Sequence, residues 1–152
     1  MLDKLVTEVL SRHWPKPPLP SAERQRLLTA IPFSIPQDLA YFFTKCNGAT
    51  LFDPDRSRYM LVGVEGFHPT RFDIFGRDED AFGPAGLFTV CDVQDGNFVA
   101  LDLSHAELSR CPTLDCFHET FGDPSYQLRV IAESFTDFLA RALDSANKLY
   151  WL

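Results

Sequence analysis

Hydrophobic residues in the first part of the chain recur every three or four positions, the spacing of one helical face. This pattern predicts an amphipathic helix over residues 2–13, stopped by the proline-rich stretch 14–20, which we expect to be a short extended linker. A second helix is predicted from Ser21, whose hydroxyl suits a helix cap, through about Leu28. The chain is therefore expected to begin with helices.

A third helix has both of its ends marked by residue type. Pro36 suits the first position of a helix, and the apolar residues within 39–46 share one face. Asn47 and Gly48 follow, and glycine takes the left-handed conformation of a helix terminus without a side-chain penalty. We expect Asn47-Gly48 to terminate this helix, although contact with a partner is the alternative role.

From residue 49 the hydrophobic period shifts toward two, which is typical of strands. Such apolar stretches lie at residues 58–64, 70–75 and 87–93. The clearest local prediction is a hairpin of 87–93 with 97–103, turned around Gln94-Asp95-Gly96, because Asp95-Gly96 supplies the positive φ of a tight turn. Weaker strands are predicted at residues 116–120 and 128–131.

A last helix is predicted where Ser134 and Asp137 form a capping box ahead of an apolar stripe. Helices, then strands, then a helix favour an α+β fold with an antiparallel-rich mixed sheet, on which the last helix packs. The expected single domain covers residues 1–152, helical over 1–48, mainly β over 49–131, with the C-terminal helix at about 134–147.

The composition of the chain indicates the compartment in which the protein works. Charged residues interrupt the first ten positions, so no signal peptide is expected, and no apolar run is long enough to cross a bilayer. We therefore expect a cytoplasmic protein whose four cysteines stay reduced.

The net charge of −7 is uneven along the chain. The segment between Asn47 and Pro124 holds 14 acidic and five basic side chains, a net charge of −9, whereas the flanks together net +2. This acidity disfavours direct nucleic-acid binding and would attract a basic protein partner. Solubility alone is the alternative reason for it.

Candidate partner-binding residues come from this acidic segment. Asp78, Glu79 and Asp80 form a run that would dock a cationic surface, with a solvated loop as the alternative. Asp92 would extend that face, while turn chemistry already explains Asp95. Some phenylalanines of the same segment could form an exposed patch, although core packing explains most aromatic residues.

Catalytic chemistry has little support in the sequence. Cys116 and His118, even with Cys111, lack the spacing of a zinc site or thiol enzyme, so we expect no metal and no cofactor. The carboxylates Asp53 and Asp73 lie among arginines and are interpreted as turn or surface residues, and no motif of a known hydrolase or nucleotide-binding loop is present.

Three segments resemble the SUKH superfamily, which includes fungal cell-wall regulators of the Smi/Knr type and bacterial immunity proteins. They are residues 35–48, 92–103 and 131–139. The resemblance implies an α+β domain without family-wide catalytic residues, and for bacterial members an antidote that binds a toxin, often a nuclease or deaminase. We therefore expect an immunity protein that binds a basic toxin. The alternatives are a regulatory scaffold that recruits an endogenous protein and, more remotely, a hydrolase.

Overall fold

The strands form one sheet in which each strand pairs with its neighbour in the chain. The computed structural model describes residues 1–105 and 110–152, and its seven strands run in the order β1 to β7, every pair antiparallel. Their bounds are Trp14–Pro15 (β1), Ala49–Thr50 (β2), Met60–Leu61 (β3), Leu87–Asp92 (β4), Phe98–Asp102 (β5), Thr113–Cys116 (β6) and Arg129–Ala132 (β7). The expected α+β fold is confirmed, with a wholly antiparallel sheet.

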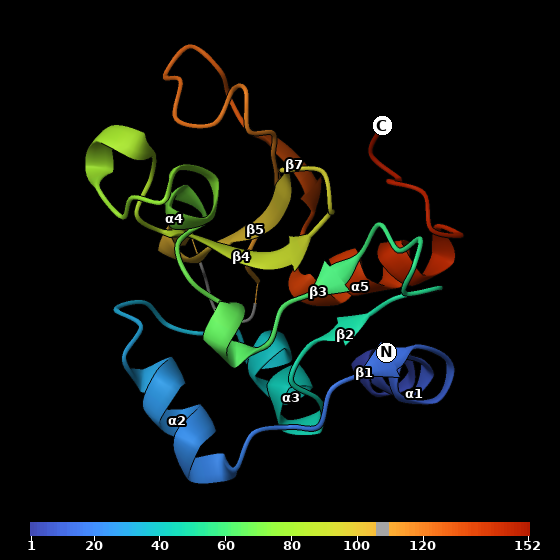
Figure 1. The fold of residues 1–152 in the computed structure, drawn as a ribbon. Coiled ribbons are helices and arrows are strands. Elements are labelled where there is room, and N and C mark those ends of the chain that lie inside the picture. The colour runs from blue at the N-terminus through green and yellow to red at the C-terminus, as the bar shows by residue number, and fades with distance from the viewer. Residues whose placement is uncertain (106–109) are drawn as a thin grey trace.

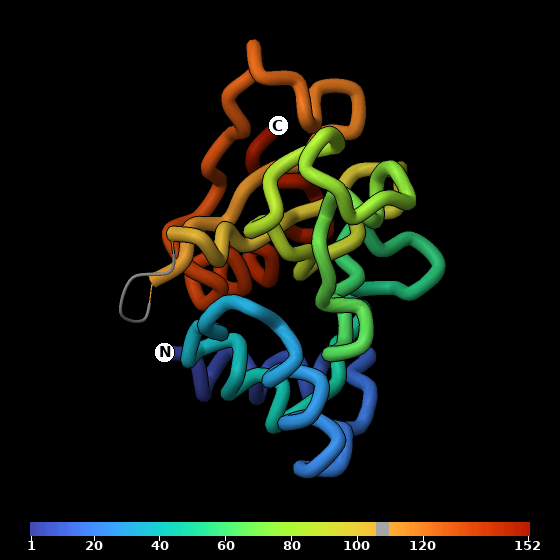
Figure 2. The backbone as a smooth tube through the Cα atoms, turned by 90° about the vertical axis from the view of Figure 1, so that its left-hand side faces the viewer, coloured from blue at the N-terminus to red at the C-terminus, as the bar shows by residue number. Residues whose placement is uncertain are grey.

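In the described residues, five α-helices accompany the sheet. They are α1 (Leu2–Arg12), α2 (Ser21–Thr29), α3 (Gln37–Lys45), α4 (Thr70–Phe75) and α5 (Phe135–Asp144). The three N-terminal helices lie at one end of the molecule and strands β4 to β7 at the other, with α5 between them (Figures 1 and 2). Short 3₁₀ turns occur at Val64–Gly66, Asp80–Phe82 and Leu103–His105.

The main core lies between the sheet and helices α1, α3 and α5. Because side chains alternate along a strand, β5 directs Val99 and Leu101 into this core and Ala100 into a second, smaller cluster on the other face. Phe42 of α3 meets Phe135 of α5 with ring centroids 5.1 Å apart. Both faces of the central strands are thus buried.

Local hydrogen bonds and turn residues explain why helix α5 and the hairpin of β4 and β5 lie close to their predicted positions. Ser134 accepts a hydrogen bond from the amide of Asp137 at 3.0 Å, and the Asp137 carboxylate accepts from the amide of Glu133 at 3.1 Å. Strands β4 and β5 form the predicted hairpin. Its positive φ angles belong to Gln94 and Gly96, so Asp95 does not supply one.

The Asn47-Gly48 pair lies just after the end of helix α3. The helix stops at Cys46, which has an extended conformation, so its terminus is not left-handed as expected; Gly48, two residues further on, has a φ of +82°. A Cβ on Gly48 would lie 2.5 Å from the Leu61 carbonyl oxygen. The Asn47 side chain accepts from the Val64 amide at 2.8 Å. The pair therefore joins α3 to the chain after β3.

Several predicted elements were wrong. The stretch 70–75 is helix α4, because Pro69 precedes a turn that Gly76 ends with a φ of +70°. The expected strand 116–120 lies earlier, as β6, and only Met60–Leu61 of 58–64 is a strand. The linker 14–20 contributes β1.

Two expected helix starts are also shifted by one residue. Pro20 and Pro36 are the N-cap residues of α2 and α3, and Ser21 is the first helical residue, without a capping side-chain hydrogen bond.

Candidate partner-binding surface

The acidic run 78–80 lies in a loop that a buried arginine holds in place. Arg71 of α4 has only 8% of its side chain exposed, and its guanidinium donates to Asp78 at 2.7 Å, to Asp80 at 2.7 Å and to the Gly83 carbonyl at 3.0 Å. The hydrogen bond to Asp80 is the main cause of the raised pKa of Arg71, so the guanidinium stays charged. The loop after α4 is therefore fixed from beneath.

This anchoring reduces the net negative charge of the acidic run. Two of its three carboxylates already face a cation, and Arg77 lies 3.8 Å from Glu79, so the loop and its anchor combine three negative with two positive charges. Each of Asp78 and Asp80 uses one oxygen for Arg71, and within residues 1–105 and 110–152 the other receives no hydrogen bond. The Asp80 side chain is 95% exposed.

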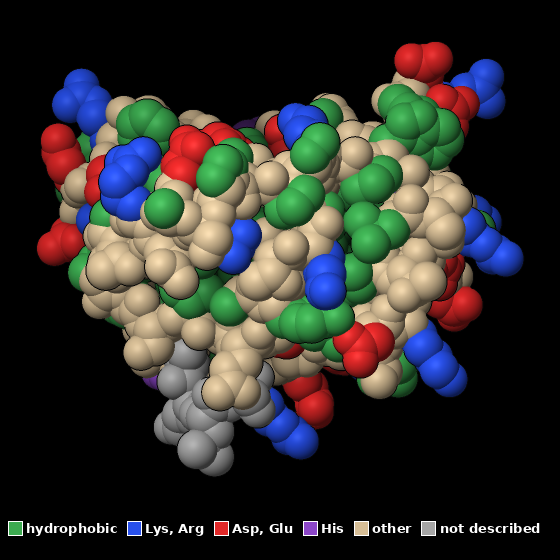
Figure 3. Space-filling view, turned by 90° about the horizontal axis from the view of Figure 1, so that it is seen from below, with side chains coloured by type: hydrophobic (Ala, Val, Ile, Leu, Met, Phe, Trp, Pro, Cys, Tyr) green, Lys and Arg blue, Asp and Glu red, His purple; other side chains and the backbone are tan. Residues whose placement is uncertain are grey.

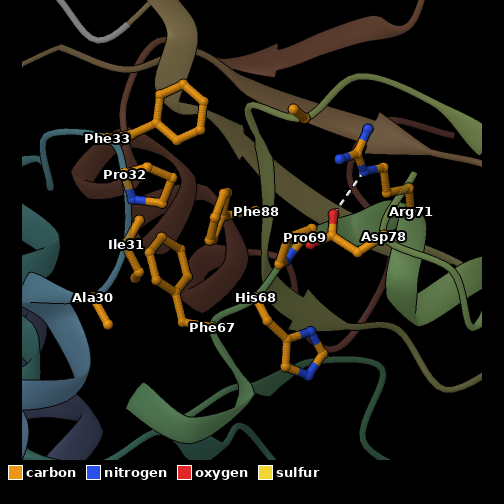
Figure 4. Close-up of a pocket in the computed structure, with 11 residues that line it drawn as sticks. Ala30, Ile31, Pro32, Phe33, Phe67, His68, Pro69, Arg71, Asp78 and Phe88 are labelled. Atoms are coloured by element: carbon orange, nitrogen blue, oxygen red, sulfur yellow. Dashed lines mark hydrogen bonds and ion pairs between the residues drawn. The ribbon is translucent and has the colours of Figure 1, made fainter. Parts of the chain in front are cut away.

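A hollow of about 320 Å³ adjoins this loop, between the connection from α2 to α3 and the start of α4. Figure 4 shows Phe33, Phe67 and Phe88 gathered on one side of it and the Arg71–Asp78 ion pair on the other. Phe88 packs edge-on against Phe33, with centroids 6.0 Å apart, and lies 5.3 Å from Phe67. The hollow thus has an aromatic wall and an acidic border.

A second hollow, of about 420 Å³, lies on the other side of the loop. Asp80, Pro84 and Ala85 border it together with Tyr126, whose exposed fraction is 59%. Ala85 lines both hollows, so the segment from Asp78 to Ala85 forms a ridge between them.

Asp73 was interpreted as a turn or surface residue, and this was wrong. Its side chain is only 15% exposed, lies 3.2 Å from the His68 ring and accepts a hydrogen bond from the Thr89 hydroxyl. Burial raises the pKa of this carboxyl, opposed by the Thr89 hydrogen bond and by His68. Asp53, in contrast, accepts from the amide of Asp55 at 3.0 Å, as expected of a turn residue.

Asp92 and the acidic run are not neighbours. The run adjoins Ala85, which lies just before the start of β4, whereas Asp92 is the last residue of β4. The six residues of this strand separate its two ends by about 16 Å. Asp92 also accepts the Gln94 amide at 2.7 Å, whereas Asp95 pairs with Arg58 at 2.9 Å. The turn chemistry assigned to Asp95 is therefore performed by Asp92.

The exposed aromatic residues of the acidic segment are few. Phe67 is buried, whereas Phe72 and Phe75 of α4 are 47% and 41% exposed. Sequence reasoning missed Arg71 and the hollow. The signal for Arg71 was the presence of several acidic residues within ten positions of an arginine among apolar residues.

The uneven charge along the chain is also uneven in space. The N-terminal helical layer contains six basic and four acidic residues, and Figure 3 shows its face with both kinds interspersed among hydrophobic side chains. The acidic segment forms the other end of the molecule, around β4 to β6 and α4. One acidic residue of that segment, Glu107, lies outside the described residues.

The cysteines have the character of core residues. All four are buried, and burial raises the pKa of Cys46 and of Cys111 to about 12. Cys116 belongs to the smaller core cluster, whereas the His118 ring lies 2.7 Å from the Asn97 side-chain oxygen. Across the described residues, no group of three or more His, Cys, Asp or Glu side chains is arranged to hold a metal ion. None of the helices there combines the length and apolar character that a membrane crossing requires.

The sequence matches the model of a known family over most of its length. The chain belongs to the SMI1 / KNR4 family (SUKH-1), whose model matches residues 18–141. It is similar to a protein of Bacillus subtilis (strain 168) named Immunity protein YokJ, with 29% identity over 121 residues, 78% of this chain and 70% of the relative.

Proposed function

We propose that this protein is an immunity protein that binds a protein toxin and neutralises it by forming a complex. The observation that carries the proposal is the similarity to Immunity protein YokJ over 78% of the chain. The acidic end of the molecule supports a basic toxin domain, of the nuclease or deaminase type, as the partner. The protein would act in the cytoplasm, where its buried thiols stay reduced.

The proposed contact surface is centred on the ridge between the two hollows. Asp78, Glu79 and Asp80 lie on it with exposed carboxylates, and Asp92 adds charge at the far end of β4. Because Arg71 holds the loop, little conformational entropy would be lost on binding. The acidic end as a whole would repel the phosphates of nucleic acids, so the partner is a protein.

A regulatory scaffold that recruits an endogenous protein is the second candidate function, supported by the same fold. A hydrolase has less support. The residues lining the first hollow include no Ser, Thr, Cys, Lys or Tyr, and the guanidinium of Arg71 is already held by three acceptors. His68 lines the hollow and pairs with Asp73, but the other lining residues include no nucleophile next to this pair.

The first experiment tests neutralisation directly. A toxin encoded next to this gene is expressed from an inducible promoter with and without this chain, and growth is followed. Restored growth, together with a complex of the two purified proteins, supports an immunity protein. If the complex does not form and growth stays inhibited, while affinity capture from the native cells returns a housekeeping protein reproducibly, the scaffold function replaces it.

A second experiment tests the acidic surface. Glu79→Arg reverses an exposed charge without removing an acceptor of Arg71, and Glu23→Arg makes the same change on α2 at the other end of the molecule. At about 8 Å in water, a two-unit charge change is worth about 1 kcal/mol, or about fivefold in association rate. Glu79→Arg should slow association with the toxin by this factor at low salt and hardly at 1 M salt. Equal rates for both variants at low salt would refute the assigned surface.

A further inference from the structure

The first hollow has the size of a site for one side chain. Its volume of about 320 Å³ is at the lower end of the range for ligand pockets, so it accommodates a single ring or a long aliphatic group. Ile31, Phe33, Phe67 and Phe88 make most of its wall apolar. A burial site of this kind gains affinity from excluding water around an apolar group.

The acidic border of the hollow favours a positively charged ligand. Asp78 lies on it with 55% of its side chain exposed, and Glu79 and Asp80 continue the acidic border outward. Among the described residues, Arg71 is the only lysine or arginine that lines the hollow, and its side chain is only 8% exposed, beneath Asp78 and Asp80. A ligand that offers a cation at the border therefore meets carboxylate oxygens, whereas an anion meets like charge.

The hollow is also formed before any partner arrives. Its acidic side is fixed by the three hydrogen bonds of Arg71, and its aromatic side by the packing of Phe88 against Phe33 and Phe67. Neither side needs to be ordered on binding, which favours a central anchor point in an interface.

We infer that this hollow binds an aromatic side chain of the toxin, presented next to a lysine or arginine that pairs with Asp78. This inference rests on the proposed function and adds the chemistry of the contact. The aromatic ring packs on the partly exposed Ile31 and Phe33, above the buried Phe67 and Phe88, and the adjacent cation lies over the acidic ridge. Such a residue in the toxin is the anchor of the complex.

The first test uses small probes that carry the two parts of this chemistry. Tryptamine joins an indole ring to an ammonium group, and indole-3-acetate joins the same ring to a carboxylate. We expect tryptamine to shift the amide resonances of Phe33, Phe67 and Ala85 in ¹⁵N-labelled protein, with affinity at least threefold higher than that of indole-3-acetate at low salt. Equal affinities, no binding, or shifts confined to another region would overturn the inference.

The second test blocks the hollow in the full chain. Ala30 lines the hollow at the end of α2 with helical backbone angles, so Ala30→Trp fills it, and Ala22→Trp adds the same ring at an exposed position of the same helix. Urea denaturation checks that both variants fold. We expect Ala30→Trp to abolish the tryptamine shifts and to weaken the complex with the catalytically inactive toxin at least about 30-fold, mainly through faster dissociation. Ala22→Trp should leave both unchanged within twofold.

The outcomes separate the inference from the proposed function. If the unmodified chain binds the toxin and Ala30→Trp binds it equally well, the hollow is not the anchor and only the inference falls. If the unmodified chain binds no toxin at low or high salt, the proposed function falls, and the inference with it.

Discussion

Replacing Gly48 with alanine tests the junction between α3 and the sheet. Gly48 has a φ of +82°, which costs a non-glycine residue about 1–2 kcal/mol. A Cβ there would also lie 2.5 Å from the Leu61 carbonyl oxygen and 2.7 Å from the Gly63 nitrogen. Both are backbone atoms and cannot rotate away, so β3 must shift, at a further cost of about 1–3 kcal/mol by analogy with overpacking. We expect Gly48→Ala to lose about 2–5 kcal/mol of unfolding free energy.

Gly76→Ala is the matched control for this substitution. Gly76 has a similar φ, +70°, but a Cβ there meets nothing within 4 Å, so only the conformational cost of about 1–2 kcal/mol applies. Urea denaturation of both variants gives the free energies and shows from the m-values whether unfolding stays comparable. Equal losses for the two variants would show that the close approach at Gly48 contributes nothing and would refute the reasoning.

Two further predictions concern the last helix and the thiols. Ser134→Ala removes the cap of α5 and should lower the unfolding free energy by about 1 kcal/mol in the same assay, whereas an unchanged value would mean that the cap contributes nothing. The pKa of Cys46 is raised from about 9.0 to about 12, so above pH 9 the unfolded chain releases its proton first, and stability should fall with rising pH by up to about 1.4 kcal/mol per unit for such a thiol. At pH 8 the folded protein should not react with Ellman's reagent, and rapid modification of a thiol in the folded state would contradict its burial.

Sequence reasoning succeeded where the signal was local. The hairpin of β4 and β5 followed from a glycine between two apolar runs, and α5 followed from Ser134 and Asp137, three residues apart. In both places the atoms that decide the structure are within a few residues of each other. The family resemblance rested on these two segments and on residues 35–48, and it is confirmed.

The failures have equally specific causes. The residues of α4 alternate between polar and apolar in part, and a helix of six residues is too short to show a 3.6-residue period, so its flanking Pro69 and Gly76 were the better signals. Strand β1 contains Pro15, which is tolerated because β1 is an edge strand of the sheet.

Of the candidate site, only the negative charge could be predicted from the sequence. The acidic run was visible in the sequence, but the hollow beside it brings together residues 30–33 and 67–88, and Arg71 neutralises part of the run through contacts that depend on the turn at Gly76. Such features depend on packing between residues far apart in the sequence, which neither hydrophobic periodicity nor a sequence motif indicates.

The position of α5 has a consequence for how the chain acquires its structure during synthesis. Successive strands can pair as they leave the ribosome, since each needs only its predecessor. Part of the core face of α3 stays uncovered until α5 arrives, and Asp38 then accepts hydrogen bonds at 2.9 Å from both the amide and the hydroxyl of Thr136, 98 residues later. A nascent chain therefore exposes the side of Phe42 that packs on Phe135 to chaperones until α5 has been synthesised.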